Sequence, residues 1–199
     1  MGTLIAVVGN TAVGKTTLVR HLSAAAPFFT GLEQHGERPF QQAFADNLQR
    51  YALANQIDYL LLRAEQEQAI RTQPGIGLVD GGLDEDFQVF ARHFWAKGYL
   101  SDAEFALCER FYSLTRQLLP PPDLFIHLTA PLAVIEQRFR RRSRSLEIAQ
   151  LADLAALDDF VAAWMAGERT TPVITVDASG DDFCAPAAIA GLLAAIHRR

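Results

Sequence analysis

Cysteine is scarce in this 199-residue chain, which contains only Cys108 and Cys184. Two cysteines are too few for a disulfide framework, and this pair lacks metal-ligand spacing, so both are expected to be free thiols. The sequence also lacks any apolar run near the ~20 residues that a membrane span needs, and no basic leader precedes the first expected strand. These absences predict a cytoplasmic protein with no membrane partner.

An excess of positive charge is lacking too, since the formal net charge is −5. Proteins that bind nucleic acid through their general surface are usually basic, so no nucleic-acid partner is expected. Internal repeats and low-complexity segments are absent as well. Half of the residues are hydrophobic, which suffices for one good core, and we therefore expect a single domain over residues 1–199.

What is present is an alternation of short apolar runs with longer stretches of helical character. Runs of this length, bounded by turn residues, are typical of buried parallel strands. The expected strands cover residues 3–8, 76–79, 124–128 and 173–176, with a weaker strand at 28–32. The expected helices cover residues 16–25, 39–71, 86–95, 101–118, 132–142, 151–166 and 185–197. This order predicts an α/β three-layer sandwich, in which helices flank a parallel five-stranded sheet.

The most informative motif follows the first expected strand directly and has the spelling GxxxxGK[ST]. In such a loop, backbone amides cradle phosphates, Lys15 reaches the β- and γ-phosphates, and the Thr16 hydroxyl holds Mg²⁺. The N-terminus of the next helix adds positive potential. The sequence therefore predicts a P-loop that binds ATP or another nucleoside triphosphate, through Gly9, Asn10, Thr11, Ala12, Val13, Gly14, Lys15, Thr16 and Thr17.

Other polar residues follow the ends of the expected strands. Ligands of parallel sheets bind beyond the carboxyl ends of the strands, so the P-loop, Glu33 and residues 80–86 are expected to converge. Asp80 ends an apolar strand, where a carboxylate commonly assists Mg²⁺ in P-loop enzymes. Thr16 and Asp80 are thus the expected metal residues.

Arginines crowd the end of one expected helix, at Arg138, Arg140, Arg141, Arg142 and Arg144. Such crowding costs self-repulsion unless an anion or carboxylates offset it, and a triphosphate would do so. A solvated arginine-rich face is the alternative.

Together these features resemble the deoxynucleoside kinase family of P-loop phosphotransferases, over Ile5 to about Asp177. The resemblance rests on the P-loop, Glu33, the helical stretch 56–63, residues 80–86, the strand 125–128 and the arginine segment with Glu147. It implies a P-loop NTPase fold with an arginine-rich lid at about 138–150. It also implies phosphorylation of the 5′-hydroxyl of a nucleoside-like small molecule, and a possible homodimer.

The resemblance assigns roles to individual residues. Glu33 sits where the family keeps its catalytic carboxylate, and Lys15 serves the donor phosphates. Among the lid residues, Arg138, Arg142 and Arg144 are implied to hold the donor, while Glu147 reaches the sugar 3′-hydroxyl. The residues implied to shape the acceptor site are Gln56, Arg63, Asp86, Phe90 and, where a tyrosine usually meets the sugar, Phe44.

Three departures from the family pattern stand out: Gly81 replaces an arginine that would hold the acceptor oxygen, Phe44 replaces the tyrosine, and Gln34 replaces a proline. Three interpretations stay open. A nearby basic side chain substitutes for the arginine, the acceptor is another small molecule, or the protein binds nucleotides with little catalysis. Under the first, an arginine introduced at position 81 is expected to increase activity, unless glycine is needed there for a positive φ.

Overall fold

The strands of the computed structural model form a parallel sheet. The structure describes residues 2–31, 38–142, 149–168 and 170–198. Within these residues the sheet has five strands in the order β2-β3-β1-β4-β5, and every neighbouring pair is parallel. The strands are β1 (Thr3–Val8), β2 (Phe29–Gly31), β3 (Ile76–Asp80), β4 (Leu124–Thr129) and β5 (Val173–Asp177).

Helices connect the strands. They are α1 (Lys15–Ala25), α2 (Gln41–Asp46), α3 (Leu48–Thr72), α4 (Leu83–Glu85), the π-helical η1 (Asp86–Ala91), α5 (Arg92–Ala96), α6 (Asp102–Leu118), α7 (Leu132–Arg141), the 3₁₀ turn η2 (Leu151–Asp153), α8 (Leu154–Gly167), the 3₁₀ turn η3 (Asp182–Cys184) and α9 (Pro186–His197).

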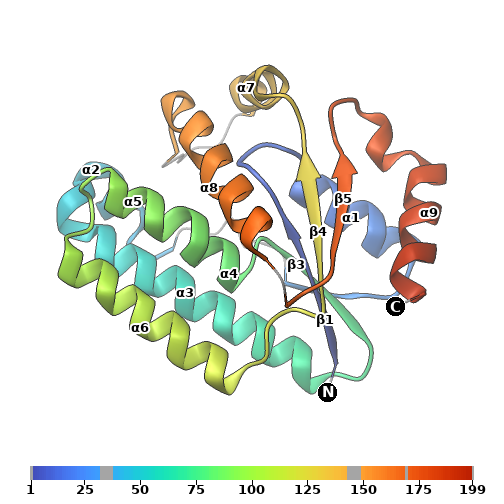
Figure 1. Cartoon of the computed structure of the whole chain (residues 1–199), viewed down its shortest axis with the longest axis horizontal. Helices are drawn as coiled ribbons and strands as arrows, with labels where there is room; N and C mark the ends of the chain where they lie inside the picture. Colours follow the sequence, from blue (N-terminus) through green and yellow to red (C-terminus); the bar gives the residue numbers. More distant parts are fainter. Residues whose placement is uncertain (1, 32–37, 143–148, 169, 199) are drawn as a thin grey trace.

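The central strand β1 shows why the molecule has three layers. Successive side chains of a strand point to opposite faces, so each face of β1 is apolar and needs a helical cover. Ile5 and Val7 pack with side chains of α1 and α9. Leu4, Ala6 and Val8 pack with Ile70 of α3 and Trp164 of α8. Figure 1 shows α1 and α9 on one side of the sheet and α3, α6 and α8 on the other.

The long helix expected at 39–71 is two helices. Asn47, between α2 and α3, has an extended backbone (φ −151°), and its side chain accepts a hydrogen bond from the Arg50 amide at 3.0 Å. Asparagine is a favourable N-cap because its short side chain satisfies an amide that the helix leaves open. The break lets α2 turn back against α3, with which it makes its main contacts.

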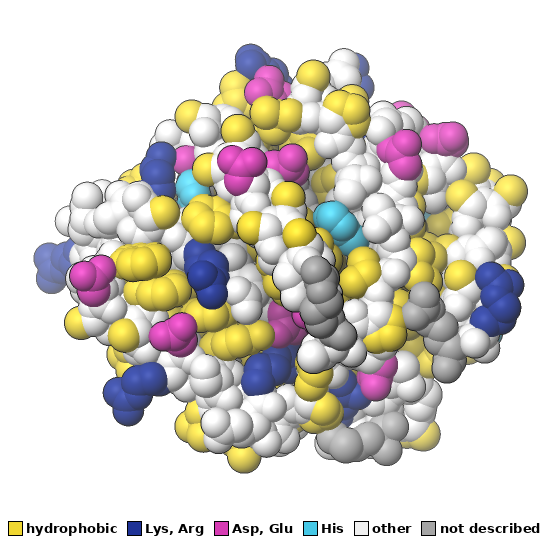
Figure 2. Space-filling model, in the orientation of Figure 1, with side chains coloured by type: hydrophobic (Ala, Val, Ile, Leu, Met, Phe, Trp, Pro, Cys, Tyr) yellow, Lys and Arg dark blue, Asp and Glu magenta, His cyan; other side chains and the backbone are white. Residues whose placement is uncertain are grey.

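The surface carries mixed charges. On the face that Figure 2 shows, acidic and basic side chains are interspersed with hydrophobic ones. In the part of the chain that the structure describes, no helix is both long enough and apolar enough to cross a bilayer.

Candidate active site

A large cavity opens beside the phosphate loop and has a volume of about 590 Å³. This volume lies within the range of small-molecule and cofactor sites. The residues that line it come from the loop and α1 (Asn10, Thr11, Ala12, Gly14, Lys15, Thr16, Thr17, Arg20), from α3, β3 and the helix after it (Arg63, Asp80, Glu85, Phe90), and from α7 and the chain after β5 (Arg138, Arg142, Asp181, Phe183). The phosphate loop and residues 80–86 thus converge as expected, while Glu33 lies outside the described residues.

Lys15 lies folded back onto its own loop. Its ammonium donates hydrogen bonds to the carbonyl oxygens of Gly9 (2.7 Å) and Asn10 (3.2 Å). A third oxygen, from the Glu85 carboxylate, lies 3.3 Å away. Three oxygens therefore surround a group that has three N–H donors.

Thr16 and Asp80 meet at the floor of this cavity. The Thr16 hydroxyl donates a hydrogen bond to the Asp80 carboxylate, and both residues line the cavity. Carboxylate and hydroxyl oxygens are the ligands that Mg²⁺ prefers, and it usually takes only a few of them from the protein. The two expected metal residues thus lie together and have suitable chemistry for the ion.

Glu85 is a prominent residue that sequence reasoning missed. Its carboxylate accepts a hydrogen bond from the Gly9 amide at 2.8 Å and faces Lys15, and the residue is 2% exposed. Burial raises the pKa of Glu85 to about 7, although Lys15 and the Gly9 amide oppose the shift. Glu85 lies within the stretch 80–86 but was assigned no role of its own, and the turn of helix after β3 brings it to the loop.

A smaller cavity of about 100 Å³ lies next to the large one, and Thr11 and Phe90 line both. Its other lining residues include Gln41, Asn55, Gln56, Tyr59, Asp86, His93 and Phe94. Gln56 is 2% exposed, and its amide nitrogen donates to the backbone oxygen of Asp86 at 2.9 Å. The structure therefore brings the expected acceptor residues Gln56, Asp86 and Phe90 together around one cavity.

Arg63 connects the two cavities. Its side chain lines the large cavity, and its Nε donates to the carboxylate of Asp86, which lines the small one, at 2.8 Å. Both side chains are largely buried, with exposed fractions of 4% and 9%. A guanidinium held in this way presents a fixed positive charge between the two spaces.

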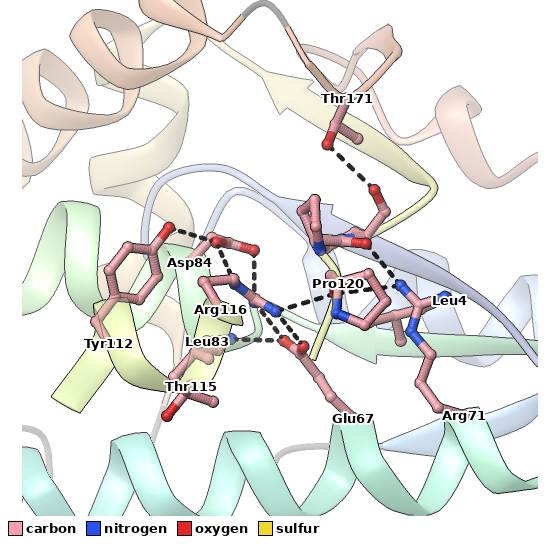
Figure 3. A network of polar contacts seen from close by, with 12 residues as sticks. Leu4, Glu67, Arg71, Leu83, Asp84, Tyr112, Thr115, Arg116, Pro120 and Thr171 are labelled. Carbon is pink, nitrogen blue, oxygen red and sulfur yellow. Dashed lines mark hydrogen bonds and ion pairs between the residues drawn. The ribbon is translucent and has the colours of Figure 1, made fainter. Parts of the chain in front are cut away.

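A buried polar network supports the turn that carries these residues. Arg116 of α6 donates to the carboxylates of Glu67 and Asp84 at 2.7–3.0 Å (Figure 3). Glu67 also accepts from the Leu83 amide at 3.2 Å, and Tyr112 donates to Asp84 at 2.7 Å. These bonds tie α4 to α3 and α6, which fixes the turn after β3 beside the cavities.

Two of the lid arginines that the structure describes, Arg138 and Arg142, line the large cavity, whereas Arg140 and Arg141 are exposed and do not line it. Arg138 donates to the carbonyl oxygens of Val13 (3.0 Å), Ala178 (2.7 Å) and Gly180 (2.8 Å). It therefore ties α7 to the phosphate loop and to the chain after β5. Arg142 lines the same cavity. The Val13 side chain points instead into the hydrophobic core.

Phe44 lines neither of the two cavities. It is fully buried, and its ring packs edge-on against Phe94 at 5.1 Å and against Tyr99 at 6.4 Å. A phenyl ring has no hydroxyl to offer a sugar, and burial in this cluster is its lowest-energy place. The expected acceptor role of Phe44 is therefore not what the geometry favours. Glu33, Arg144 and Glu147 lie outside the described residues.

Gly81 adopts a conformation that favours glycine, with φ +83°. A Cβ atom at this position would lie 2.7 Å from the nearer Glu85 carboxylate oxygen and 3.7 Å from Nη2 of Arg63. Any larger residue would therefore strain the backbone and collide with a buried carboxylate. This contact explains why glycine stands where an arginine was expected.

Comparisons with known proteins show which family the chain resembles. A family model for deoxynucleoside kinase matches residues 5–190. The chain is 28% identical over 147 residues to the deoxyadenosine/deoxycytidine kinase of Bacillus subtilis (strain 168), covering 73% of this chain and 68% of the relative. It is 26% identical over 192 residues to the deoxyguanosine kinase of the same organism, covering 90% and 88%.

Solved structures of deoxyadenosine kinase from M. mycoides share the fold. One, with the products dCMP and a flexible dCDP bound, gives a TM-score of 0.83 at 20% identity and covers 99% of this chain and 100% of its own. Another, with bound dCTP, gives 0.82 at the same identity and also covers 99% and 100%. The predicted parallel sheet, flanking helices and kinase chemistry are confirmed, and the chain belongs to the deoxynucleoside kinase family, whose members phosphorylate deoxynucleosides.

Proposed function

We propose that this kinase uses ATP and Mg²⁺ to phosphorylate the 5′-hydroxyl of deoxyadenosine and deoxycytidine. The observation that carries the proposal is the acceptor-rich wall of the smaller cavity. Asp86 offers a carboxylate, and Gln56 keeps its amide oxygen because its nitrogen already donates to Asp86. The Oδ1 atom of Asn55 is buried and has no hydrogen-bond partner among the described residues.

Acceptor oxygens select a base that carries N–H donors. The exocyclic amino groups of adenine and cytosine are such donors, whereas thymine presents carbonyl oxygens in the corresponding place. A buried acceptor left without a partner costs about 1–3 kcal/mol, which disfavours thymidine. Curated relatives act on deoxyadenosine, deoxycytidine and deoxyguanosine, according to their names.

An acceptor panel tests this assignment. ADP release is measured with ATP and each of deoxyadenosine, deoxycytidine, deoxyguanosine and thymidine, together with the matching ribonucleosides and monophosphates. We expect the highest kcat/KM with deoxyadenosine or deoxycytidine. Turnover confined to another small acceptor, or the absence of turnover with retained ATP binding, would contradict the proposal and favour the other two interpretations of Gly81.

The residues that line the large cavity support the proposed site for ATP and Mg²⁺. Lys15, Arg138 and Arg142 face the space for the phosphates, and Thr16 and Asp80 supply oxygens for Mg²⁺, which would neutralise phosphate charge when bound. We propose Glu33 as the base for the acceptor hydroxyl, because β2 ends at Gly31, whose partner Val79 precedes Asp80. Arg144 and Glu147 keep their proposed lid roles.

Arg63 is our candidate for the group that replaces the missing arginine. Its Nη2 lies 3.7 Å from the point where a side chain at position 81 would begin, so the guanidinium occupies the neighbouring space. It also lines the large cavity beside Glu85 and Asp80. The positive charge is thus supplied from α3 instead of from the turn after β3.

Arg63→Lys tests this substitution. A lysine keeps the charge beside Asp86 but loses the fork of N–H donors, so we expect kcat/KM for the deoxynucleoside to fall by about tenfold or more. The KM for ATP is expected to change little. Arg50→Lys, on an exposed position of the same helix, is the matched control. Equal kinetics for the two variants would contradict a role for Arg63 in the reaction.

Gln56→Ala tests base recognition. The side chain lines only the smaller cavity, so its loss should raise KM for the deoxynucleoside by about tenfold, the effect of one buried hydrogen bond, and leave KM for ATP nearly unchanged. Gln68→Ala, at an exposed position of the same helix, controls for helix stability. Similar increases for both substrates would mean that Gln56 acts only through the fold.

We further propose a homodimer that uses the outer faces of α3 and α6. Large apolar side chains are exposed there, namely Leu61 (45%), Leu107 (43%), Leu114 (58%) and Leu118 (74%). Exposed apolar area of this kind commonly marks a protein interface. Light scattering of the purified protein, with Leu114→Glu for comparison, decides the oligomeric state.

A further inference from the structure

The carboxylate of Glu85 stands inside a cavity that must accept phosphates. It lines the large cavity at 2% exposure, between the Gly9 amide (2.8 Å) and the Lys15 ammonium (3.3 Å). A backbone amide and an ammonium are the two kinds of donor that a P-loop presents to a phosphate oxygen. Glu85 therefore interacts with two donors that are suited to bind a phosphate oxygen of the nucleotide.

Lys15 cannot bind a phosphate oxygen while it keeps all of its present contacts. Its three N–H groups face the oxygens of Gly9, Asn10 and Glu85, at 2.7, 3.2 and 3.3 Å. Contact with a phosphate oxygen requires that one of these be given up. The Glu85 contact is the longest of the three, and it is the only one to an anion that competes with phosphate.

Glu85 and the donor phosphates both carry negative charge, so they repel each other and compete for Lys15. Burial already makes the negative charge of Glu85 costly, and the carboxylates of Asp80 and Asp86 add to this cost. Lys15 offsets it from the loop, and Arg63 of α3 also lines this cavity, with its Nη2 3.7 Å from the point where a side chain at Gly81 would begin. A triphosphate that attracts Lys15 away would leave Glu85 ionised beside further negative charge.

We propose that Glu85 is a positioning residue that holds Lys15 as a counter-ion while the site is empty, yields it to the donor phosphates, and thereby weakens donor affinity. Gly81 is needed for this arrangement, because only a residue without Cβ leaves room for the Glu85 carboxylate. Gly81 and Glu85 are thus coupled through this close approach. The inference rests on the proposed ATP donor but not on the identity of the acceptor.

Glu85→Gln is the variant that tests the exchange. Its amide oxygen can still accept from the Gly9 amide, and its volume is nearly unchanged, but the competing charge is gone. We expect the Kd for ATP, measured by calorimetry without acceptor, to fall by about tenfold. In turnover, KM for ATP should fall while KM for the deoxynucleoside stays the same.

Asp158→Asn provides the matched control. Asp158 lies on the other side of the loop, where it accepts from the Asn10 side chain at 3.1 Å, and no contact joins it to Lys15 among the described residues. This variant removes the same charge near the same loop. If it tightens ATP binding as much as Glu85→Gln does, a general field effect replaces the proposed exchange.

A second measurement needs only the wild-type protein. Phosphates close to Glu85 should raise its pKa further, so ATP binding near pH 7.5 should be accompanied by proton uptake, measured in buffers of different ionisation enthalpy. Glu85→Gln should show only the uptake that ATP itself contributes.

The outcomes separate the two proposals. If folded Glu85→Gln binds ATP with unchanged or weaker affinity, the proposed exchange of Lys15 is wrong. It is also wrong if the wild-type protein binds ATP without proton uptake. This second measurement tests the exchange even if the variant does not fold. Failure of the wild type to bind ATP at all overturns the donor assignment as well. Inactivity towards deoxyadenosine and deoxycytidine, with ATP binding intact, affects only the proposed acceptors.

Discussion

Lys15→Ala is expected to weaken ATP binding by about 10²–10³-fold, or ~3–4 kcal/mol, which lies within the ~2–5 kcal/mol cost of truncating one partner of a desolvated charge pair. The loss has two parts. The phosphates lose the ammonium, and Glu85 remains in the cavity without the cation that now lies 3.3 Å from it. Its negative charge then acts on the phosphates directly. Calorimetry with ATP measures the change, and circular dichroism checks that the fold persists.

Lys97→Ala is the control for this variant. Lys97 is exposed and pairs with Asp153 at 2.8 Å, and it lines neither of the two cavities. Its removal is expected to leave ATP affinity within about twofold, because neither Lys97 nor its buried partner Asp153 lines one of these cavities. Equal affinities of Lys15→Ala and the wild type would refute the assignment of the loop.

The sheet was predictable because its strands are short, apolar and bounded by turn residues. Residues 3–8 form β1 as expected, and the strands at 76, 124 and 173 each begin where the sequence predicts, with one further residue at the end. Buried parallel strands need apolar side chains on both faces, so little else in the chain competes with them. The phosphate loop was predictable for a different reason, because its geometry requires specific residues at fixed spacing.

Other features depend on packing that no local pattern encodes. The break at Asn47 interrupts a stretch whose apolar spacing continues on both sides, so only the cap distinguishes it. Phe44 matched a family position, yet an aromatic cluster buries it. The π-helical turn at Asp86–Ala91 carries the cavity residues Asp86 and Phe90, and a period of 3.6 residues does not reveal it.

Glu85 shows the same limit at the active site. A lone glutamate five residues after a strand resembles any exposed helix residue in sequence. Its proximity to Lys15 results from the sharp turn at Gly81 and Gly82, both with positive φ, and from the network of Glu67, Asp84 and Arg116 that holds the turn. The absent arginine was visible in the sequence, but the position of the Glu85 carboxylate between Gly9 and Lys15 was not.

Gly81→Arg is expected to lower both stability and activity, which reverses the expectation from family resemblance alone. The left-handed backbone, with φ +83°, costs a non-glycine residue roughly 1–3 kcal/mol. The first side-chain carbon would also lie 2.7 Å from the Glu85 carboxylate, which must then leave its place at Gly9 and Lys15. We expect kcat/KM to fall by at least ~10², because a distorted turn no longer holds Asp80 and Arg63 in the positions that the reaction needs. Urea unfolding and ADP release measure the two effects.

Two alanine variants separate the causes. Gly98 also has a positive φ of +69°, but a Cβ there meets nothing within 4 Å, so Gly98→Ala reports the backbone strain alone. Gly81→Ala adds the collision with Glu85, and we expect it to be the more destabilising of the two. Combining Gly81→Ala with Glu85→Ser should recover the difference, because the collision partner is gone and only the strain remains. If Gly81→Arg instead proves stable and faster with deoxynucleosides, the loop accommodates the family arginine, and the coupling of Gly81 to Glu85 is wrong.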